Sequence, residues 1–148
     1  MFKKIGIIAI LILLSATLAV AAVSEEKINA TKNVGYTVVP AEYTGGGVGI
    51  RTVQASIKQG ETNWHTRDVA TFITTLNVDL NWGNSGNSLR LKIYSPDGYT
   101  FGPYFDNADG VIDGRINLDI KNPNGIAKGT WYYEVYGYSV TGTEDYSI

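Results

Sequence analysis

The feature that most constrains this chain is an alternation of apolar and polar residues, with a period of two, that begins near residue 50. Residues 76–82 alternate Leu, Val, Leu and Trp with Asn, Asp and Asn, and the same pattern recurs at 89–94, 115–120 and 131–136. Successive side chains of a strand point to opposite faces, so each segment predicts a strand with one apolar and one polar face. No window shows a sustained helical period, and the chain is therefore predicted to be all-β.

Turn residues separate these strands and set the expected architecture. Clusters of Gly, Asn, Asp and Pro, which favour reverse turns, stand at 84–87, 95–98 and 122–125. Weaker strands are predicted over 49–58, 99–101 and 144–148. The total of about seven to eight strands, at this spacing, is typical of an antiparallel jelly-roll-like β-sandwich, with a closed barrel as the alternative.

The N-terminus carries an apolar segment that does not belong to the β domain. Lys3 and Lys4 precede an apolar run from Ile5 to Val23, which ends in small residues. This pattern predicts an export signal helix over residues 1–22. The alternative is an uncleaved membrane anchor, because the run approaches the roughly 20 residues that span a bilayer. Either way, the remainder is predicted to be secreted or at the cell surface, with a membrane contact only through this segment if it is uncleaved.

Removing residues 1–22 leaves 126 residues and moves the formal net charge from −2 to −4, because Lys3 and Lys4 are lost with it. This length fits one domain with a single core. Residues 23–49 are predicted to be a tether, because they are charged at one end and glycine-rich at the other, and only Val34–Val39 resembles a strand. The β-sandwich domain is predicted over 50–148.

Composition excludes several kinds of chemistry. The chain has no cysteine, so disulfides, thiol catalysis and cysteine-ligated zinc are excluded. It has no cluster of Lys and Arg that would neutralise phosphates, so nucleic acid is not an expected partner. His65 is the one histidine, and no Gly-x-Ser-x-Gly elbow supplies a nucleophile for it. We therefore predict a protein that is not an enzyme and needs no cofactor, with a hydrolase using His65 as the less favoured alternative.

Three segments together carry a resemblance to a known family. They are Leu-Arg-Leu-Lys-Ile-Tyr-Ser-Pro-Asp-Gly at 89–98, Gly-Thr-Trp-Tyr-Tyr-Glu-Val-Tyr-Gly-Tyr at 129–138 and Asp-Tyr-Ser-Ile at 145–148. In order and spacing they resemble the bacterial and archaeal pre-peptidase C-terminal (PPC) domain, over roughly residues 64–148. The resemblance implies a jelly-roll-like β-sandwich that accompanies secreted peptidases or surface proteins and serves adhesion, substrate binding or export rather than hydrolysis.

Calcium binding is a further possibility that the resemblance raises. Some members of that family bind calcium, but Ser88 and Arg90 stand where the first strand usually carries two carboxylates. The acidic loop 106–114 is the other candidate, because calcium prefers oxygen ligands. Its candidate ligands are Asp106, Asn107, Asp109 and Asp113. The spacing is not that of an EF-hand. The interpretation we favour is a polar loop whose side chains cap backbone groups.

Tyrosines suggest where a ligand would bind. Tyr132, Tyr136 and Tyr138 would project from one face of a regular strand, and Tyr94 stands beside a turn. A tyrosine offers flat apolar area with a hydroxyl at its edge, which suits a sugar ring, an extended peptide or a neighbouring domain. A second sheet or the tether covering these rings is the alternative.

The function predicted from these observations is a non-catalytic exported binding or accessory domain. Its expected partner is an extracellular polymer, a peptide or glycan, or a partner protein such as a separately encoded peptidase. The alternative is a structural component of the cell envelope, in which the final strand over 144–148 would pair with another chain as an open edge does.

Overall fold

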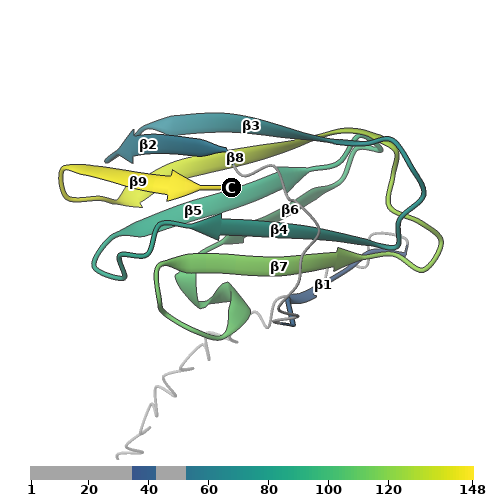
Figure 1. Cartoon of the computed structure of the whole chain (residues 1–148), viewed down its shortest axis with the longest axis horizontal. Helices are drawn as coiled ribbons and strands as arrows, with labels where there is room; N and C mark the ends of the chain where they lie inside the picture. The colour runs from purple at the N-terminus through teal and green to yellow at the C-terminus, as the bar shows by residue number, and fades with distance from the viewer. Residues whose placement is uncertain (1–34, 43–52) are drawn as a thin grey trace, which may run out of the picture.

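The structure, a computed structural model, describes residues 35–42 and 53–148. Two antiparallel sheets pack face to face (Figure 1). The first sheet, sheet A, contains in spatial order β1 (Thr37–Pro40), β7 (Arg115–Lys121), β4 (Thr75–Asn81), β9 (Thr143–Ser147) and β2 (Gln54–Lys58). The second, sheet B, contains β3 (Thr62–Val69), β8 (Gly129–Ser139), β5 (Ser88–Tyr94) and β6 (Thr100–Tyr104). The prediction of an all-β chain is confirmed for the described residues.

Helical structure within the described ranges is confined to one short turn, the 3-10 helix η1 (Asp106–Asp109) before β7. Nowhere in residues 35–42 and 53–148 does a helix have the length and apolar character to cross a membrane. The apolar segment predicted as a signal or anchor helix over 1–22 lies outside the described residues.

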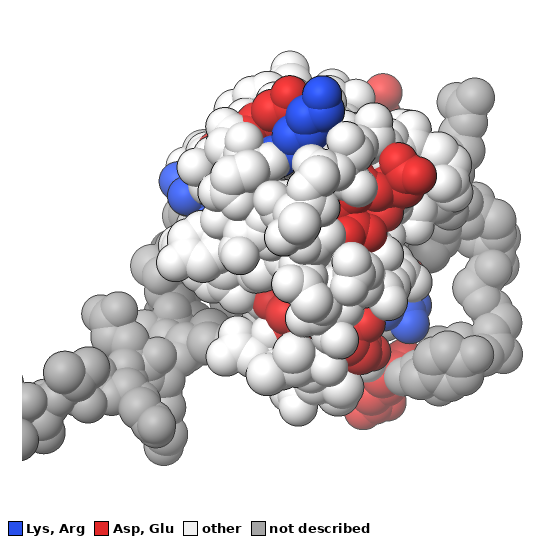
Figure 2. Space-filling view, turned by 90° about the vertical axis from the view of Figure 1, so that its left-hand side faces the viewer, with Lys and Arg blue, Asp and Glu red and all other residues white. Residues whose placement is uncertain are grey.

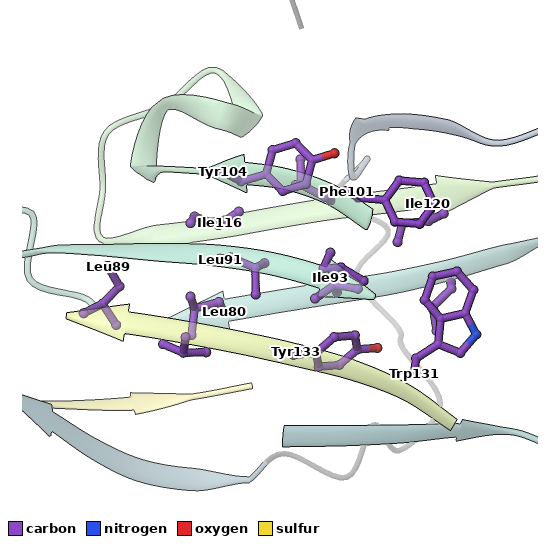
Figure 3. Close-up of a cluster of buried hydrophobic side chains, with 14 of the residues drawn as sticks. Leu80, Leu89, Leu91, Ile93, Phe101, Tyr104, Ile116, Ile120, Trp131 and Tyr133 are labelled. Carbon is purple, nitrogen blue, oxygen red and sulfur yellow. The ribbon is translucent and has the colours of Figure 1, made fainter. Parts of the chain in front are cut away.

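The alternation seen in the sequence decides which side chains form the core. In β4, β5 and β7 every second residue is buried, among them Leu80, Leu91 and Ile116, each with no exposed surface. These side chains meet between the two sheets (Figure 3). Because the opposite positions stay polar, the strands hold their register, since a slip by one residue would put the apolar set in water.

Aromatic residues close one part of this core. Trp131 of β8 is fully buried, its indole N–H donates to the carbonyl of Ala127 at 3.0 Å, and its ring stacks on Phe101 at 5.9 Å between centroids (Figure 3). A buried tryptophan needs such a partner for its N–H. The alternation over 131–136 puts Trp131 on the predicted apolar face of its strand, and its burial confirms this.

Residues 35–42 correct the predicted tether. Tyr36 is 4% exposed and packs edge-on against Phe101 and Trp131, and β1 pairs with β7. The domain boundary at residue 50 is therefore too late, because part of the segment 23–49 contributes to the core. Local composition could not reveal this pairing, since the partner strand is distant in the sequence. The other residues of the predicted tether lie outside the described ranges.

Strand β3 was not predicted from the sequence, whereas β1 overlaps the segment Val34–Val39 that resembled a strand but was assigned to the tether. The inward positions of β3 are Asn63, His65 and Arg67, which are polar, so residues 62–69 lack the apolar face by which strands were recognised. The strand forms because it pairs with β8 along its whole length, from Thr62 opposite Tyr136 to Val69 opposite Gly129. With β1 and β3, the described residues contain nine strands rather than seven to eight.

Strand β9 is not an edge strand, which corrects the expectation for 144–148. It lies between β2 and β4 in sheet A. It pairs with β2 along all five residues, but with β4 only at Ser147 opposite Asn81. Sheet A is therefore split between β4 and β9 for most of their length, and the polar inner face of β3 lies across from this split.

Candidate binding surface on sheet B

The outer face of sheet B gathers aromatic residues from three neighbouring strands. The register places Trp64 of β3 beside Glu134 of β8, and Tyr132 of β8 beside Tyr94 of β5. Tyr136 follows on the same face of β8. We call Trp64, Tyr94, Tyr132 and Tyr136 the aromatic face. Antiparallel pairing brings them together, because directly opposite side chains project from the same side of a sheet at about 5 Å between Cβ atoms.

Glu134 lies at the centre of the aromatic face and is buried although it points away from the core. It is 9% exposed, and its two carboxylate oxygens accept hydrogen bonds from the Tyr94 hydroxyl at 2.7 Å and from Arg90 Nη2 at 2.8 Å. The rings of Trp64 and Tyr94 approach to 5.5 Å between centroids. A charge at such a position is tolerated because both oxygens have donors and a cation is adjacent.

The same contacts shift the titration of the two acidic groups. The hydrogen bond from Tyr94, followed by that from Arg90, lowers the pKa of Glu134 below its ordinary value, although burial acts in the opposite direction. The hydrogen bond to Glu134 raises the pKa of Tyr94. At neutral pH the face therefore carries an ionised carboxylate and a neutral phenol.

Arg90 links the carboxylate to the last ring of the face. Its guanidinium carbon lies 4.4 Å from the centroid of the Tyr136 ring, which is a cation–π arrangement. The same side chain forms the ion pair with Glu134. Sequence reasoning saw Arg90 only as an obstacle to calcium, and the structure gives it the role of holding Glu134 and Tyr136 in fixed positions.

Two rings of the face are open to a ligand. Trp64 is 57% exposed and Tyr132 is 48% exposed, and Tyr94 and Tyr136 are half-buried. The structure thus brings together three of the four predicted tyrosines. Tyr138 lies beyond an irregularity at the start of β5 and packs on Phe105 at 4.9 Å between ring centroids.

Trp64 is the residue of this surface that the sequence analysis missed. In a strand over residues 62–69, Trp64 would point outward together with Thr62, Thr66 and Asp68. This position could be predicted only if residues 62–69 were first recognised as a strand.

The acidic loop uses its carboxylates on its own backbone. Asp106 accepts hydrogen bonds from the backbone N–H groups of Asp113, Gly114 and Arg115 at 3.0 to 3.2 Å. This geometry supports the interpretation of a capped loop.

The other predicted ligands of the loop do not converge on a common point. Asp109 accepts from Val111 and Asn117, and Asn107 and Asp113 are exposed. Within the part of the chain that the structure describes, no three His, Asp or Glu side chains are grouped to hold a metal. Calcium binding stays a prediction.

His65 lies on the inner side of β3, not on the aromatic face. Its Nε2 is 2.7 Å from the hydroxyl of Tyr146, which also accepts a hydrogen bond from Asn63 at 3.0 Å. Burial lowers the pKa of His65. A neutral imidazole that accepts the Tyr146 proton accounts for these contacts, and the arrangement supports a structural role for His65.

Comparison with known proteins identifies one archaeal relative of this chain. No family model matches the chain. Over 51 residues the chain is 51% identical to a protein of Archaeoglobus fulgidus, and the aligned stretch covers 34% of this chain and 71% of that protein. The chain belongs to the family of this archaeal protein. The relative is described as an uncharacterized protein, so the relationship supplies ancestry and no activity.

Side chains from β3, β8 and β5 place two exposed rings beside a fixed and charge-paired carboxylate. Such a surface can stack on a flat ligand and exchange hydrogen bonds with its polar groups.

Proposed function

We propose that this chain is an exported, non-catalytic binding module whose aromatic face binds a glycan chain. The observation that carries the proposal is the pair of exposed rings, Trp64 and Tyr132, beside the hydrogen-bonded pair of Arg90 and Glu134. A sugar ring has an apolar face that stacks on an aromatic ring and hydroxyl groups at its rim that need partners. Arg90 and Glu134 offer both donors and acceptors.

The strand order supports a classification with jelly-roll domains of the PPC type. Strands β2, β9, β4 and β7 follow one another in sheet A, and β3, β8, β5 and β6 in sheet B. This distribution of consecutive strands between two sheets is the jelly-roll pattern, which lectin domains also use. The apolar run before residue 24 supports export.

A glycan fits this surface better than a peptide strand does. Peptides commonly bind by adding a strand to an open sheet edge. The exposed rings, by contrast, lie on a face, over strands β3 and β8. At the centre of the face the charge of Glu134 is matched by its ion pair with Arg90, and Lys92, which lies opposite Glu134 in the register, adds a further donor for the hydroxyl groups of a sugar.

The distribution of charge elsewhere supports the exclusion of nucleic acid. The end of the molecule seen in Figure 2 shows small separate groups of acidic and basic side chains on a largely uncharged surface. A nucleic-acid site needs a continuous row of Lys and Arg along the phosphates.

Affinity electrophoresis in gels that contain neutral polysaccharides tests the proposal. The full chain is compared with the variants Trp64→Ala and Tyr132→Ala in gels of xylan, glucomannan and starch. We expect at least one polysaccharide to retard the chain, and each variant to weaken that retardation by about tenfold in affinity, as is typical of an aromatic hot spot.

Phe72→Ala is the matched control, because Phe72 is 65% exposed but lies in the loop between β3 and β4. It should bind as the unchanged chain does. The proposal is wrong if no polysaccharide retards the chain, or if the three variants lose affinity equally.

A further inference from the structure

A cleft of about 100 Å³ opens on the side of the molecule away from the aromatic face, where β4 and β9 separate. Its walls come from β3, β4, β8 and the end of β9. The lining residues that matter here are His65, Arg67, Asn77, Asp79, Tyr133 and Ser147. The split in sheet A therefore gives solvent a path to the polar inner face of β3.

Arg67 is the cation of this cleft. It is half-buried, and it forms no ion pair or side-chain hydrogen bond with any residue in the described ranges. Asp79 also lines the cleft, but both of its oxygens accept hydrogen bonds from Arg115 at 2.7 Å. The charge of Asp79 is thus compensated by Arg115. The guanidinium of Arg67 is available to bind an anionic ligand.

Tyr133 supplies an unused hydrogen-bond donor beside Arg67. It is 6% exposed and projects from β8 into the interior (Figure 3), yet its hydroxyl has no hydrogen-bond partner among residues 35–42 and 53–148. Burial raises the pKa of Tyr133, and the nearby charge of Arg67 opposes this shift. The phenol therefore stays protonated at neutral pH. Because Tyr133 lines the cleft, its unpaired hydroxyl can donate a hydrogen bond to a ligand that enters there.

We propose that this cleft binds a carboxylate group, held by the guanidinium of Arg67 and the hydroxyl of Tyr133. The planar fork of an arginine matches the two oxygens of a carboxylate. A water molecule occupies roughly 30 Å³ of liquid, so the cleft has room for about three waters, or for a carboxylate with one or two carbons. A larger acid would place its carboxylate in the cleft and the remainder outside. This site is independent of the aromatic face.

Thermal unfolding of the full chain in sodium acetate, compared with sodium chloride and sodium sulfate at equal ionic strength, tests the site. Acetate should raise Tm above both reference salts, because a ligand that binds only the folded chain stabilises it. Arg67→Met should lower the acetate affinity at least tenfold. Tyr133→Phe keeps the ring and removes only the hydroxyl, so it should retain the unliganded Tm and weaken acetate several-fold.

Lys92→Met is the control, because Lys92 stands on the outer face of sheet B and should leave acetate binding unchanged. Two further probes identify the source of the carboxylate: tighter binding of glucuronate than of N-acetylglycine indicates an acidic sugar, and the reverse indicates a peptide terminus. The proposal is overturned if acetate has no more effect than chloride or sulfate, or if Arg67→Met and Tyr133→Phe both bind acetate as the unchanged chain does.

Discussion

At the scale of single residues, two carboxylates are buried, and each stabilises the fold only because hydrogen-bond donors surround it. Glu134 is buried on the outer face of sheet B and is held by Arg90 and Tyr94. Asp106 is buried in the acidic loop and is held by backbone N–H groups. A partner removed from either carboxylate leaves a buried polar group unsatisfied, which costs more than an average hydrogen bond contributes.

Glu134 should make stability depend on pH. Its pKa in the folded chain is lowered from 4.5 by Tyr94 and Arg90, so its contribution is fully present above pH 4.5 and is lost as pH falls through the lower folded-state value. Glu134→Gln should be less stable than the unchanged chain at pH 7, and its stability should fall less steeply below pH 4.5.

Urea unfolding at several pH values between 3 and 7 measures this difference. The free energy of unfolding also falls on acidification because of His65, whose pKa is lowered from 6.5 by burial. Both proteins contain His65, so this contribution cancels in the comparison. Parallel pH curves for the two proteins would contradict the assigned role of Glu134.

Asp106 should stabilise the loop through its backbone caps. Asp106→Ala leaves three N–H groups without their acceptor and should cost about 1–3 kcal/mol of unfolding free energy. Asp113→Ala is the matched control: Asp113 is an exposed acid of the same loop and should change stability by less than about 0.5 kcal/mol.

Chemical denaturation of both variants, with millimolar calcium and with a chelator, provides the measurement. We expect no calcium-dependent shift, since Asp106 and Asp109 are already used as caps. A denaturation midpoint of the unchanged chain that rises with calcium, and no longer does so in Asp109→Asn together with Asp113→Asn, would instead establish the calcium site predicted from the sequence.

At the scale of elements, β3 contributes to both proposed sites although its sequence pattern is weak. β3 supplies Trp64 to the aromatic face and Arg67 to the cleft, and its polar inner positions conceal it from a search for alternation. β1 is short, and its contribution to the core comes from Tyr36, which precedes it. β3 forms because β8 supplies its hydrogen bonds, and β1, whose own residues are strand-like, joins the domain because it pairs with β7.

Tyr36 should be one of the most destabilising sites to change. Its hydroxyl donates to Asp97 at 3.0 Å and accepts from the N–H of Ala127 at 3.1 Å, while its ring contacts Phe101 and Trp131. Tyr36→Ala should cost about 3–5 kcal/mol, as is usual for truncation of a buried aromatic residue.

Tyr36→Phe separates packing from hydrogen bonding and should cost only about 0.5–1.5 kcal/mol. Thr37→Ala, at an exposed position of β1, is the control. Guanidinium unfolding compares the three variants. A Tyr36→Ala variant as stable as the control would show that residues 35–42 do not stabilise the domain, as expected of a tether.

At the scale of the whole molecule, one core joins both sheets. Leu80 and Ile116 of sheet A meet Leu91 and Trp131 of sheet B (Figure 3). Tyr36 belongs to the same cluster. Neither sheet can keep its apolar face dry without the other. The absence of cysteine leaves this packing to hold the domain without disulfides.

The chain should therefore unfold in a single cooperative transition. Trp82 follows β4 of sheet A and Trp131 lies in β8 of sheet B, and both are buried, so tryptophan fluorescence follows the packing of both sheets, and far-ultraviolet circular dichroism follows the strands. Their denaturation curves should coincide, as expected of a two-state domain of this size. Separate midpoints would show that the two sheets unfold independently.

The sequence by itself determined the fold class, the four strongest strands and the core, because burial of one face forces a period of two on β4, β5, β7 and β8. It also pointed to Tyr132, Tyr136 and Tyr94. Only the tertiary structure decided that Trp64 joins these tyrosines, that β1 belongs to the domain and that sheet A splits beside Arg67. The physical reason is that alternation is a local property of one strand. A binding surface depends on which distant strands pair and in what register, and this is set by the packing of the entire chain.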